Sequence, residues 1–265
     1  MTAATPTAEF ASLVYGPGGV AFDDPAETYH EASSLYPDVA PARIHSLLEL
    51  QASPALQQTV ARASYTRDHL PATDLPPVEL GPIRLDEALI ARRSRSAETV
   101  RSLSCAALGS LLGTAYRSAD GRRPVPSGGA LYPLELYVIA LDVESVEAGV
   151  HHYNPYRHRL EGLGPIDRAD VARTLVEPTL VDAAAALIVL TAMFWRSRFK
   201  YGLRGYRFAL LEAGHVMQNA VLAAAALGVA ARPLGGYYDR LLDGLVGADS
   251  LDEASLYALL LGGGA

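Results

Sequence analysis

The chain has 265 residues, of which 50% are hydrophobic and 19% charged, and its formal net charge is −7. These values predict a globular protein of one or two domains and exclude an intrinsically disordered chain. The excess of acidic residues argues against a nucleic-acid partner, because binding to phosphates needs a surplus of Lys and Arg. Cys105 is the only cysteine, which excludes an internal disulfide and a cysteine metal cluster.

The longest apolar runs, residues 183–195 and 220–231, are shorter than the ~20 residues that span a bilayer. Residues 1–9 contain neither the basic nor the apolar region of an export signal. We therefore expect a cytoplasmic protein without a membrane segment.

Composition divides the chain near residue 80. Residues 1–80 are rich in Pro, Ala, Thr and Ser, which is typical of an N-terminal arm, with short helices expected near 29–33 and 44–50. Residues 81–265 have the pattern of one compact domain. The predicted elements, in chain order, are helices 85–93 and 104–116, strands 135–141, 149–153 and 159–163, helix 167–175, strand 184–194, helix 207–228, strand 229–233, helix 239–246 and strand 255–261.

These strands and helices follow one another without a strict βαβ repeat, and no G-x-G-x-x-G follows a strand. A dinucleotide-binding Rossmann domain is therefore disfavoured, and the predicted class is α+β. The predicted helix 207–228 is apolar on nearly all sides and rich in small residues. This pattern indicates a helix buried centrally or at a subunit interface, with His215 as a core histidine.

A loop poor in side chains precedes the strand 135–141. Pro126 restricts its backbone, Ser127 offers a hydroxyl, and Gly128 and Gly129 remove side chains where something must approach closely. Such a loop suits the grip of a flat polar ring. The alternative is an ordinary turn before a strand, since Pro, Ser and Gly are common turn residues.

Two further segments carry groups that suit a flavin. Arg92, Arg93 and Ser94 follow the first helix of the domain, and guanidinium forks with a hydroxyl suit a phosphate or the pyrimidine edge of a flavin. The alternative is a solvated basic patch at a helix C-terminus. Leu234, Gly235 and Gly236 follow a predicted strand, where a glycine pair exposes backbone N–H groups to a ring nitrogen or a phosphate. Glycines at strand ends are, however, common.

Lys200 and Tyr201 lie in a predicted loop, 199–207, beside the long helix. Adjacent lysine and tyrosine side chains can supply a proton acceptor and a proton donor. The alternative is a charged surface loop. The seven histidines do not have the spacing of metal ligands, so no metal site is expected.

Taken together, six motifs resemble the SagB-type (McbC-like) dehydrogenases of the nitroreductase superfamily. They are, in chain order, Arg92-Arg93-Ser94, the run 126–133, the run 149–153, Lys200-Tyr201-Gly202, the run 211–215 with Gln218-Asn219, and the run 233–236. The resemblance extends from about residue 85 to the C-terminus. Residues 29–33 also resemble a short motif that these proteins carry upstream.

The resemblance implies an α+β nitroreductase-like fold, with a central mixed or antiparallel sheet flanked by helices. It also implies a homodimer with FMN between the subunits, and the oxidation of thiazoline or oxazoline rings in a peptide to thiazole or oxazole. Lys200 and Tyr201 would then be the catalytic pair. The residues implied to bind FMN are Arg92, Arg93, Ser94, Pro126, Ser127, Gly128, Gly129, Leu234, Gly235 and Gly236.

Two positions depart from the family pattern. Ser96 stands where a basic residue is usual, and the C-terminal run 262–265 lacks the basic residue that often binds the phosphate. Arg95, Arg204 or Arg207 are the candidates to replace these contacts. The expected substrate is an azoline-containing peptide or carrier-bound molecule, with a cyclodehydratase or peptide-synthetase complex as a possible partner. The alternatives are an NAD(P)H-dependent nitro- or quinone reductase and a flavin-poor scaffold subunit.

Overall fold

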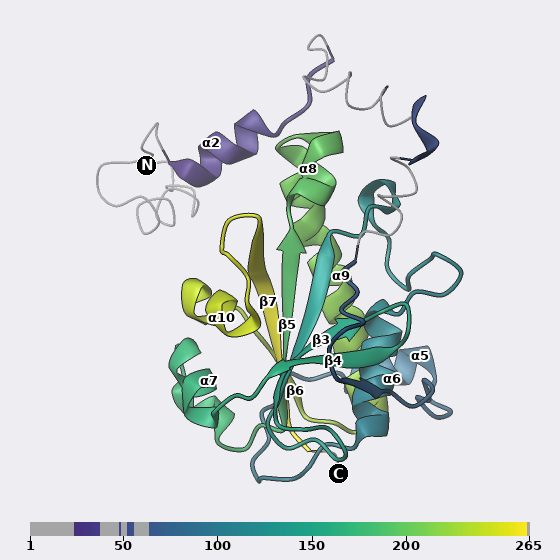
Figure 1. The fold of residues 1–265 in the computed structure, drawn as a ribbon, viewed down its shortest axis with the longest axis vertical. Coiled ribbons are helices and arrows are strands. Elements are labelled where there is room, and N and C mark those ends of the chain that lie inside the picture. The colour runs from purple at the N-terminus through teal and green to yellow at the C-terminus, as the bar shows by residue number, and fades with distance from the viewer. Residues whose placement is uncertain (1–23, 38–47, 49–51, 56–63, 264–265) are drawn as a thin grey trace, which may run out of the picture.

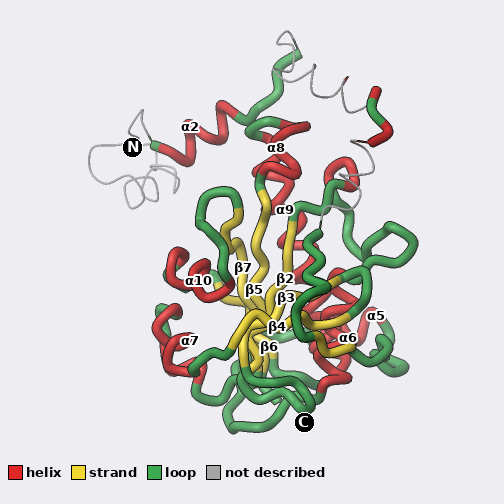
Figure 2. Tube along the Cα trace, viewed as in Figure 1, coloured by secondary structure: helices red, strands yellow, loops and turns green. Residues whose placement is uncertain are grey.

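A computed structural model of the protein describes residues 24–37, 48, 52–55 and 64–263. Figure 1 shows the fold, and Figure 2 shows how its strands gather at the centre with helices on both sides. The principal helices are α2 (Pro25–Ala32), α5 (Leu85–Ala91), α6 (Cys105–Tyr116), α7 (Arg168–Thr174), α8 (Trp195–Tyr201), α9 (Arg204–Leu227) and α10 (Asp239–Val246). The strands are β1 (Ala72–Asp74), β2 (Leu134–Ala140), β3 (Gly149–Asn154), β4 (Arg159–Gly164), β5 (Ala186–Met193), β6 (Ala231–Leu234) and β7 (Glu253–Leu261).

The strands form one seven-stranded sheet in the order β1-β4-β3-β2-β5-β7-β6. Every pairing in it is antiparallel. All residues of β2 and β5, which pair with each other near the centre of the sheet, are buried. The predicted meander of β2, β3 and β4 and the predicted α+β class are therefore confirmed. β1 comes from the predicted N-terminal arm and forms one edge of the sheet.

Helices cover both faces of the sheet (Figure 1). Alternate residues of β2, such as Leu136 and Val138, belong to a core that includes α6 and α9. The residues between them, such as Tyr137 and Ile139, belong to a second core that includes α7 and α10. This alternation follows from the two-residue period of a strand, which points successive side chains to opposite faces.

Helix α9 is covered on one side only. Its 24 residues have the length and apolarity of a membrane-crossing helix, a property shared with core helices of soluble proteins, and it packs on α6. Leu210 and Leu211 are 44% and 60% exposed, and His215 is exposed rather than in the core as predicted. Central burial of this helix is therefore wrong for the single chain, because the sheet and α6 reach only one face, whereas its burial at a subunit interface stays a prediction.

Two further predictions need correction or fall outside the described structure. The segment expected to be a loop, 199–207, instead contains the end of α8 and the start of α9, with Gly202 between the helices at φ 57°. The short helix expected at 44–50 lies almost entirely outside the described residues. The other predicted elements of the compact domain are present, with boundaries shifted by a few residues.

Candidate active site

Residues 126–129, which we call the glycine loop, lead into β2 with an uncommon backbone. Gly129, Ala130 and Tyr132 have φ values of 65°, 54° and 45°. Positive φ is strained for residues that carry a Cβ, and such strain persists only where the surroundings enforce it. Here the Tyr132 backbone N–H donates to the Ser127 hydroxyl at 2.9 Å. The loop is thus closed on itself, with Pro126 and Gly129 exposed.

Helix α8 brings Lys200 and Tyr201 onto the glycine loop. A Cβ at Gly129 would lie 2.6 Å from the Tyr201 hydroxyl oxygen and 2.8 Å from Lys200 Nζ. A Cβ at Gly128 would lie 2.9 Å from the ring of Phe208. The Tyr201 ring in turn meets the Phe208 ring edge to face, with centroids 4.9 Å apart. The two glycines therefore allow an ammonium and a phenol to lie directly against the loop.

A buried carboxyl lies behind the glycine loop. Glu212 of α9 is 2% exposed and accepts a hydrogen bond from the Tyr116 hydroxyl at 2.9 Å. Its second oxygen has no hydrogen-bond partner in the described part of the chain. Burial raises the pKa of Glu212 to about 7, although Ser127, Tyr116 and the charge of Arg123 act in the opposite direction. An ionisable group thus supports the loop from inside.

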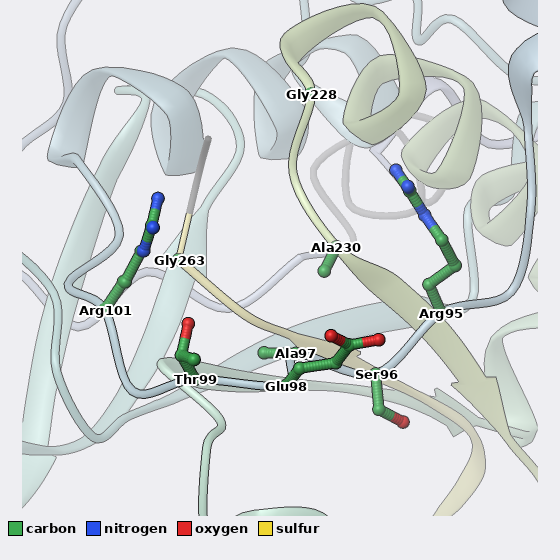
Figure 3. Close-up of a pocket in the computed structure, with 9 residues that line it drawn as sticks. All are labelled: Arg95, Ser96, Ala97, Glu98, Thr99, Arg101, Gly228, Ala230 and Gly263. Atoms are coloured by element: carbon green, nitrogen blue, oxygen red, sulfur yellow. The ribbon is translucent and has the colours of Figure 1, made fainter.

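A second cluster lies near the other end of α9, around residues 92–96, which we call the basic segment. The Arg95 backbone N–H donates to the Ala231 carbonyl at 2.9 Å, and Arg232 Nη1 donates to the Ser96 hydroxyl at 3.4 Å. Arg95 and Arg101 flank an open hollow of about 290 Å³ (Figure 3). The other lining residues are Ser96, Ala97, Glu98, Thr99, Gly228, Ala230 and Gly263. Sequence reasoning missed Arg101 and Arg232, although both are basic residues close to the matched motifs.

The predicted cofactor ligands of the basic segment have different environments. Arg92 is half-buried and makes no ion pair with any described residue. Arg93 instead turns back to the end of α5, where it donates to the carbonyls of Ile90 and Arg92 at 2.7 and 2.9 Å. Ser94 is exposed. Arg92 and Ser94 are therefore accessible to a ligand, whereas Arg93 is engaged with the C-terminus of a helix.

The glycines after β6 leave an open surface. Leu234 is buried, whereas Gly235 and Gly236 are exposed. No atom lies within 4 Å of the position of a Cβ at Gly235, and at Gly236 only the side chain of Val176 does. Backbone N–H groups at such a surface can be approached closely by a flat ligand.

The structure does not bring all predicted site residues of one chain together. The glycine loop contacts Phe208 near the start of α9, whereas the hollow of the basic segment includes Gly228 at its end. Twenty residues of α-helix separate these points, which corresponds to about 30 Å. That separation exceeds the length of an FMN molecule. The glycine loop and the hollow of the basic segment therefore lie at opposite ends of α9 within one chain.

A buried charged network that sequence reasoning missed underlies α8. Glu135 accepts hydrogen bonds from Arg196 of α8 and from the Tyr65 backbone N–H, and it pairs with His152 at 2.9 Å. His152 also contacts Glu161 at 3.3 Å. Burial alone would lower the pKa of His152, but its hydrogen bonds to the two carboxylates raise it. The network fixes the first turn of α8 to the sheet.

Comparison with known proteins identifies the family. A family model described as the nitroreductase family matches residues 92–263. The chain belongs to the nitroreductase family. It is 36% identical over 170 residues to a protein of Methanocaldococcus jannaschii named as a nitroreductase, which covers 62% of this chain and 84% of that protein.

Two further comparisons support the predicted relationship to McbC-like proteins. The chain is 35% identical over 169 residues to the microcin B17-processing protein McbC of Escherichia coli, covering 60% of this chain and 62% of McbC. It also matches a chain of the E. coli microcin synthetase McbBCD complex with a TM-score of 0.57 and 26% identity, over 89% of this chain and 91% of that chain. The predicted nitroreductase-like fold and the resemblance to McbC-like members are thus confirmed. The chain spans less than two thirds of the length of McbC.

Proposed function

We propose that this protein is an FMN-dependent dehydrogenase that oxidises thiazoline or oxazoline rings in a peptide to the aromatic azoles. The observation that carries the proposal is the contact of Lys200 and Tyr201 with the glycine loop at Gly129. A nitroreductase that takes hydride from NAD(P)H does not require a lysine-tyrosine pair at its flavin. The likeness to McbC, named for microcin B17 processing, supports a peptide substrate.

The residues present fit an FMN molecule. The space beside Gly235 is open where a side chain would fill it, and Arg92 has no ion-pair partner among the described residues. Arg95, Arg101 and Arg232 gather at the hollow of the basic segment, beside Ser96. Guanidinium groups bind phosphate oxygens in bidentate fashion. Arg92, Ser94 and these arginines would hold the phosphate end, and Gly235 and Gly236 the ring end.

The site is proposed to form between two copies of the chain. Because about 30 Å of α9 separates the glycine loop from the basic segment, the glycine loop of one copy would complete the flavin site of the other. The exposed apolar residues of α9, Leu210 and Leu211, supply a surface for this pairing. A homodimer would also cover Leu210 and Leu211, which the single chain leaves exposed.

The chemistry needs a proton and a hydride to leave adjacent ring carbons. Lys200 or Tyr201 would remove the proton from the carbon next to the acyl group, and both lie where a ring stacked on the glycine loop can be reached. A bound FMN would supply the acceptor for the hydride that leaves the neighbouring carbon. Ser127 and Glu212 would keep the loop in place during this step. The product ring is aromatic, which favours the reaction.

The experiment is turnover of a thiazoline-containing peptide by the purified protein in the presence of oxygen. We expect a yellow protein that releases FMN and no FAD, and a peptide that becomes lighter by two hydrogen atoms. Lys200→Ala and Tyr201→Phe should retain the flavin and lose about 10²–10⁴-fold in rate, the contribution of a positioned base. Rapid oxidation of NADPH with a nitroaromatic and no reaction with the azoline would establish a reductase. A protein that binds no flavin after reconstitution would be a scaffold.

We also propose a substrate class and a partner enzyme for this chain. The related E. coli synthetase complex was solved with a truncated pro-peptide bound. We propose that the present chain likewise acts on a peptide or carrier-bound azoline, beside a cyclodehydratase or a peptide synthetase that forms the ring, in the cytoplasm. The test of this partnership is co-purification of the chain with a cyclodehydratase or peptide synthetase that is encoded nearby.

A further inference from the structure

Helix α2 packs against the turn at Gly202 and Leu203 between α8 and α9, which we call the α8–α9 corner. In the sequence, 174 residues separate Tyr29 of α2 from Leu203. None of the residues of α2 is buried, so apolar burial does not hold the helix there. Instead the Tyr29 hydroxyl donates to the Leu203 carbonyl at 2.9 Å, and the Tyr29 ring meets Tyr206 edge to face at 5.5 Å. Ser33, directly after α2, is 3% exposed and accepts from Arg207 Nε at 2.7 Å.

Two arginines of α9 bind the C-terminal end of α2. Arg204 donates to the Ser33 carbonyl at 3.2 Å, and Arg207 donates to the His30 carbonyl. The end of a helix presents unpaired carbonyls and a partial negative charge, which attract cations. Both arginines lie near the start of α9, where the helix dipole disfavours cations. Their position is therefore explained by α2 and not by α9 alone. Within one chain, Arg204 and Arg207 lie at the opposite end of α9 from the hollow of the basic segment.

The corner that α2 contacts is directly connected to the lysine-tyrosine pair. Lys200 and Tyr201 end α8, and Gly202 is the only residue between Tyr201 and Leu203. α8 and α9 touch backbone to backbone, because a Cβ at Gly205 would lie 2.7 Å from the carbonyl carbon of Ser197. A change in the position of the corner is thus transmitted to the end of α8 without a flexible segment in between.

We propose that α2 is a positioning element for the reaction, in which Tyr29 and Ser33 hold the α8–α9 corner so that Lys200 and Tyr201 stay against the glycine loop. Neither Tyr29 nor Ser33 touches the glycine loop or the lysine-tyrosine pair. The catalytic part of this inference rests on the function proposed above, whereas the docking of α2 does not. A displacement of about 1 Å in a positioned group can cost 10²-fold in rate. Two lost hydrogen bonds are therefore sufficient to change the turnover.

The test uses four single variants of the full flavin-loaded protein and one double variant, Tyr29→Phe with Ser33→Ala. Tyr29→Phe removes the hydroxyl and keeps the ring, and Ser33→Ala removes the hydroxyl that Arg207 contacts. Ser33→Thr keeps a hydroxyl and is the conservative rescue. Tyr36→Phe is the matched control, because the Tyr36 hydroxyl donates to Glu31 within the same segment. Each variant is examined by amide hydrogen exchange across residues 198–207 and by steady-state kinetics on an azoline peptide.

We expect the variant with both Tyr29→Phe and Ser33→Ala to exchange about thirtyfold faster at 198–207, with α6 unchanged, since it loses two hydrogen bonds of about 1 kcal/mol each and about 1.4 kcal/mol corresponds to a factor of ten. Its kcat should fall at least tenfold while KM and bound flavin stay the same. Ser33→Thr and Tyr36→Phe should match the wild type in both measurements. Unchanged exchange at the corner overturns the proposal, and so does a lower kcat that is accounted for by flavin loss or unfolding. If the wild type oxidises no azoline, the proposed function fails, and the exchange data alone decide whether α2 holds the corner.

Discussion

Replacing Glu212 by glutamine is expected to stabilise the protein at alkaline pH. The pKa of Glu212 is about 7 in the folded chain, because burial outweighs Tyr116, Ser127 and Arg123, against an ordinary value of 4.5. A raised carboxyl pKa supplies stability that is complete below pH 4.5 and is lost as the pH rises through 7. At 1.36 kcal/mol per unit of pKa, the full loss is about 3 kcal/mol, of which roughly 2.5 kcal/mol falls between pH 5 and pH 8. Glutamine does not ionise and keeps an acceptor for the Tyr116 hydroxyl, so it escapes this loss.

The assay is urea unfolding of the flavin-loaded wild type and of Glu212→Gln at pH 5 and pH 8. The unfolding free energy of Glu212→Gln minus that of the wild type should be roughly 2.5 kcal/mol higher at pH 8 than at pH 5. Tyr116→Phe removes a hydrogen bond that favours the carboxylate, so it should lose stability mainly at pH 8. Glu79→Gln, at an exposed position outside the site, controls for the loss of one charge. A wild type and a Glu212→Gln variant with parallel pH profiles would refute the reasoning.

Three other substitutions test the geometry of the site. Gly129→Ala should lower kcat at least tenfold, because Gly129 has a φ of 65° and an added Cβ would meet the ends of the Lys200 and Tyr201 side chains. Gly244→Ala, in a helix with open space around this position, should leave kcat unchanged. Steady-state kinetics on both variants check this. Leu211→Glu should give monomers in light scattering and release flavin, since a charge on the exposed face of α9 opposes pairing; a flavin-loaded dimer would contradict it. Arg92→Ala should weaken FMN binding about tenfold or more in a fluorescence titration, which is the contribution of a charge-assisted hydrogen bond. Arg93→Ala should leave FMN binding largely unchanged, because Arg93 donates to carbonyls at the end of α5. Equal effects of the two arginine substitutions would show that the assignment is wrong.

The fold was largely predictable because its buried strands and capped helices leave local patterns. The helix predicted to begin at residue 104, for example, is capped by Ser104, whose hydroxyl accepts from the Ala107 backbone N–H. α8 was not predictable in this way, since Trp195–Tyr201 contains three cations and shows no apolar face. In the fold, Arg196 of this helix pairs with buried Glu135, a contact between residues 61 positions apart that no local pattern predicts.

The site was predictable in its parts but not in its assembly. Local motifs identified the glycine loop and the lysine-tyrosine pair, yet only the tertiary structure brings Gly129 against Lys200 and separates both from the basic segment. Glu212 lies within the matched run 211–215 and is the one carboxylate of α9, a signal that could have been used. Such a residue is almost never fully buried without a partner, so it marks a functional or strained position.

The direction of electron flow tests the central proposal most directly. In an anaerobic single-turnover measurement, the oxidised flavoprotein is mixed rapidly with a thiazoline-containing peptide while the visible absorption of the flavin is followed. We predict that the absorption is lost at a rate that depends on Lys200 and Tyr201, with one thiazole formed per flavin. A flavin that keeps its colour with the peptide and is bleached by NADPH alone would contradict the assignment as an azoline dehydrogenase.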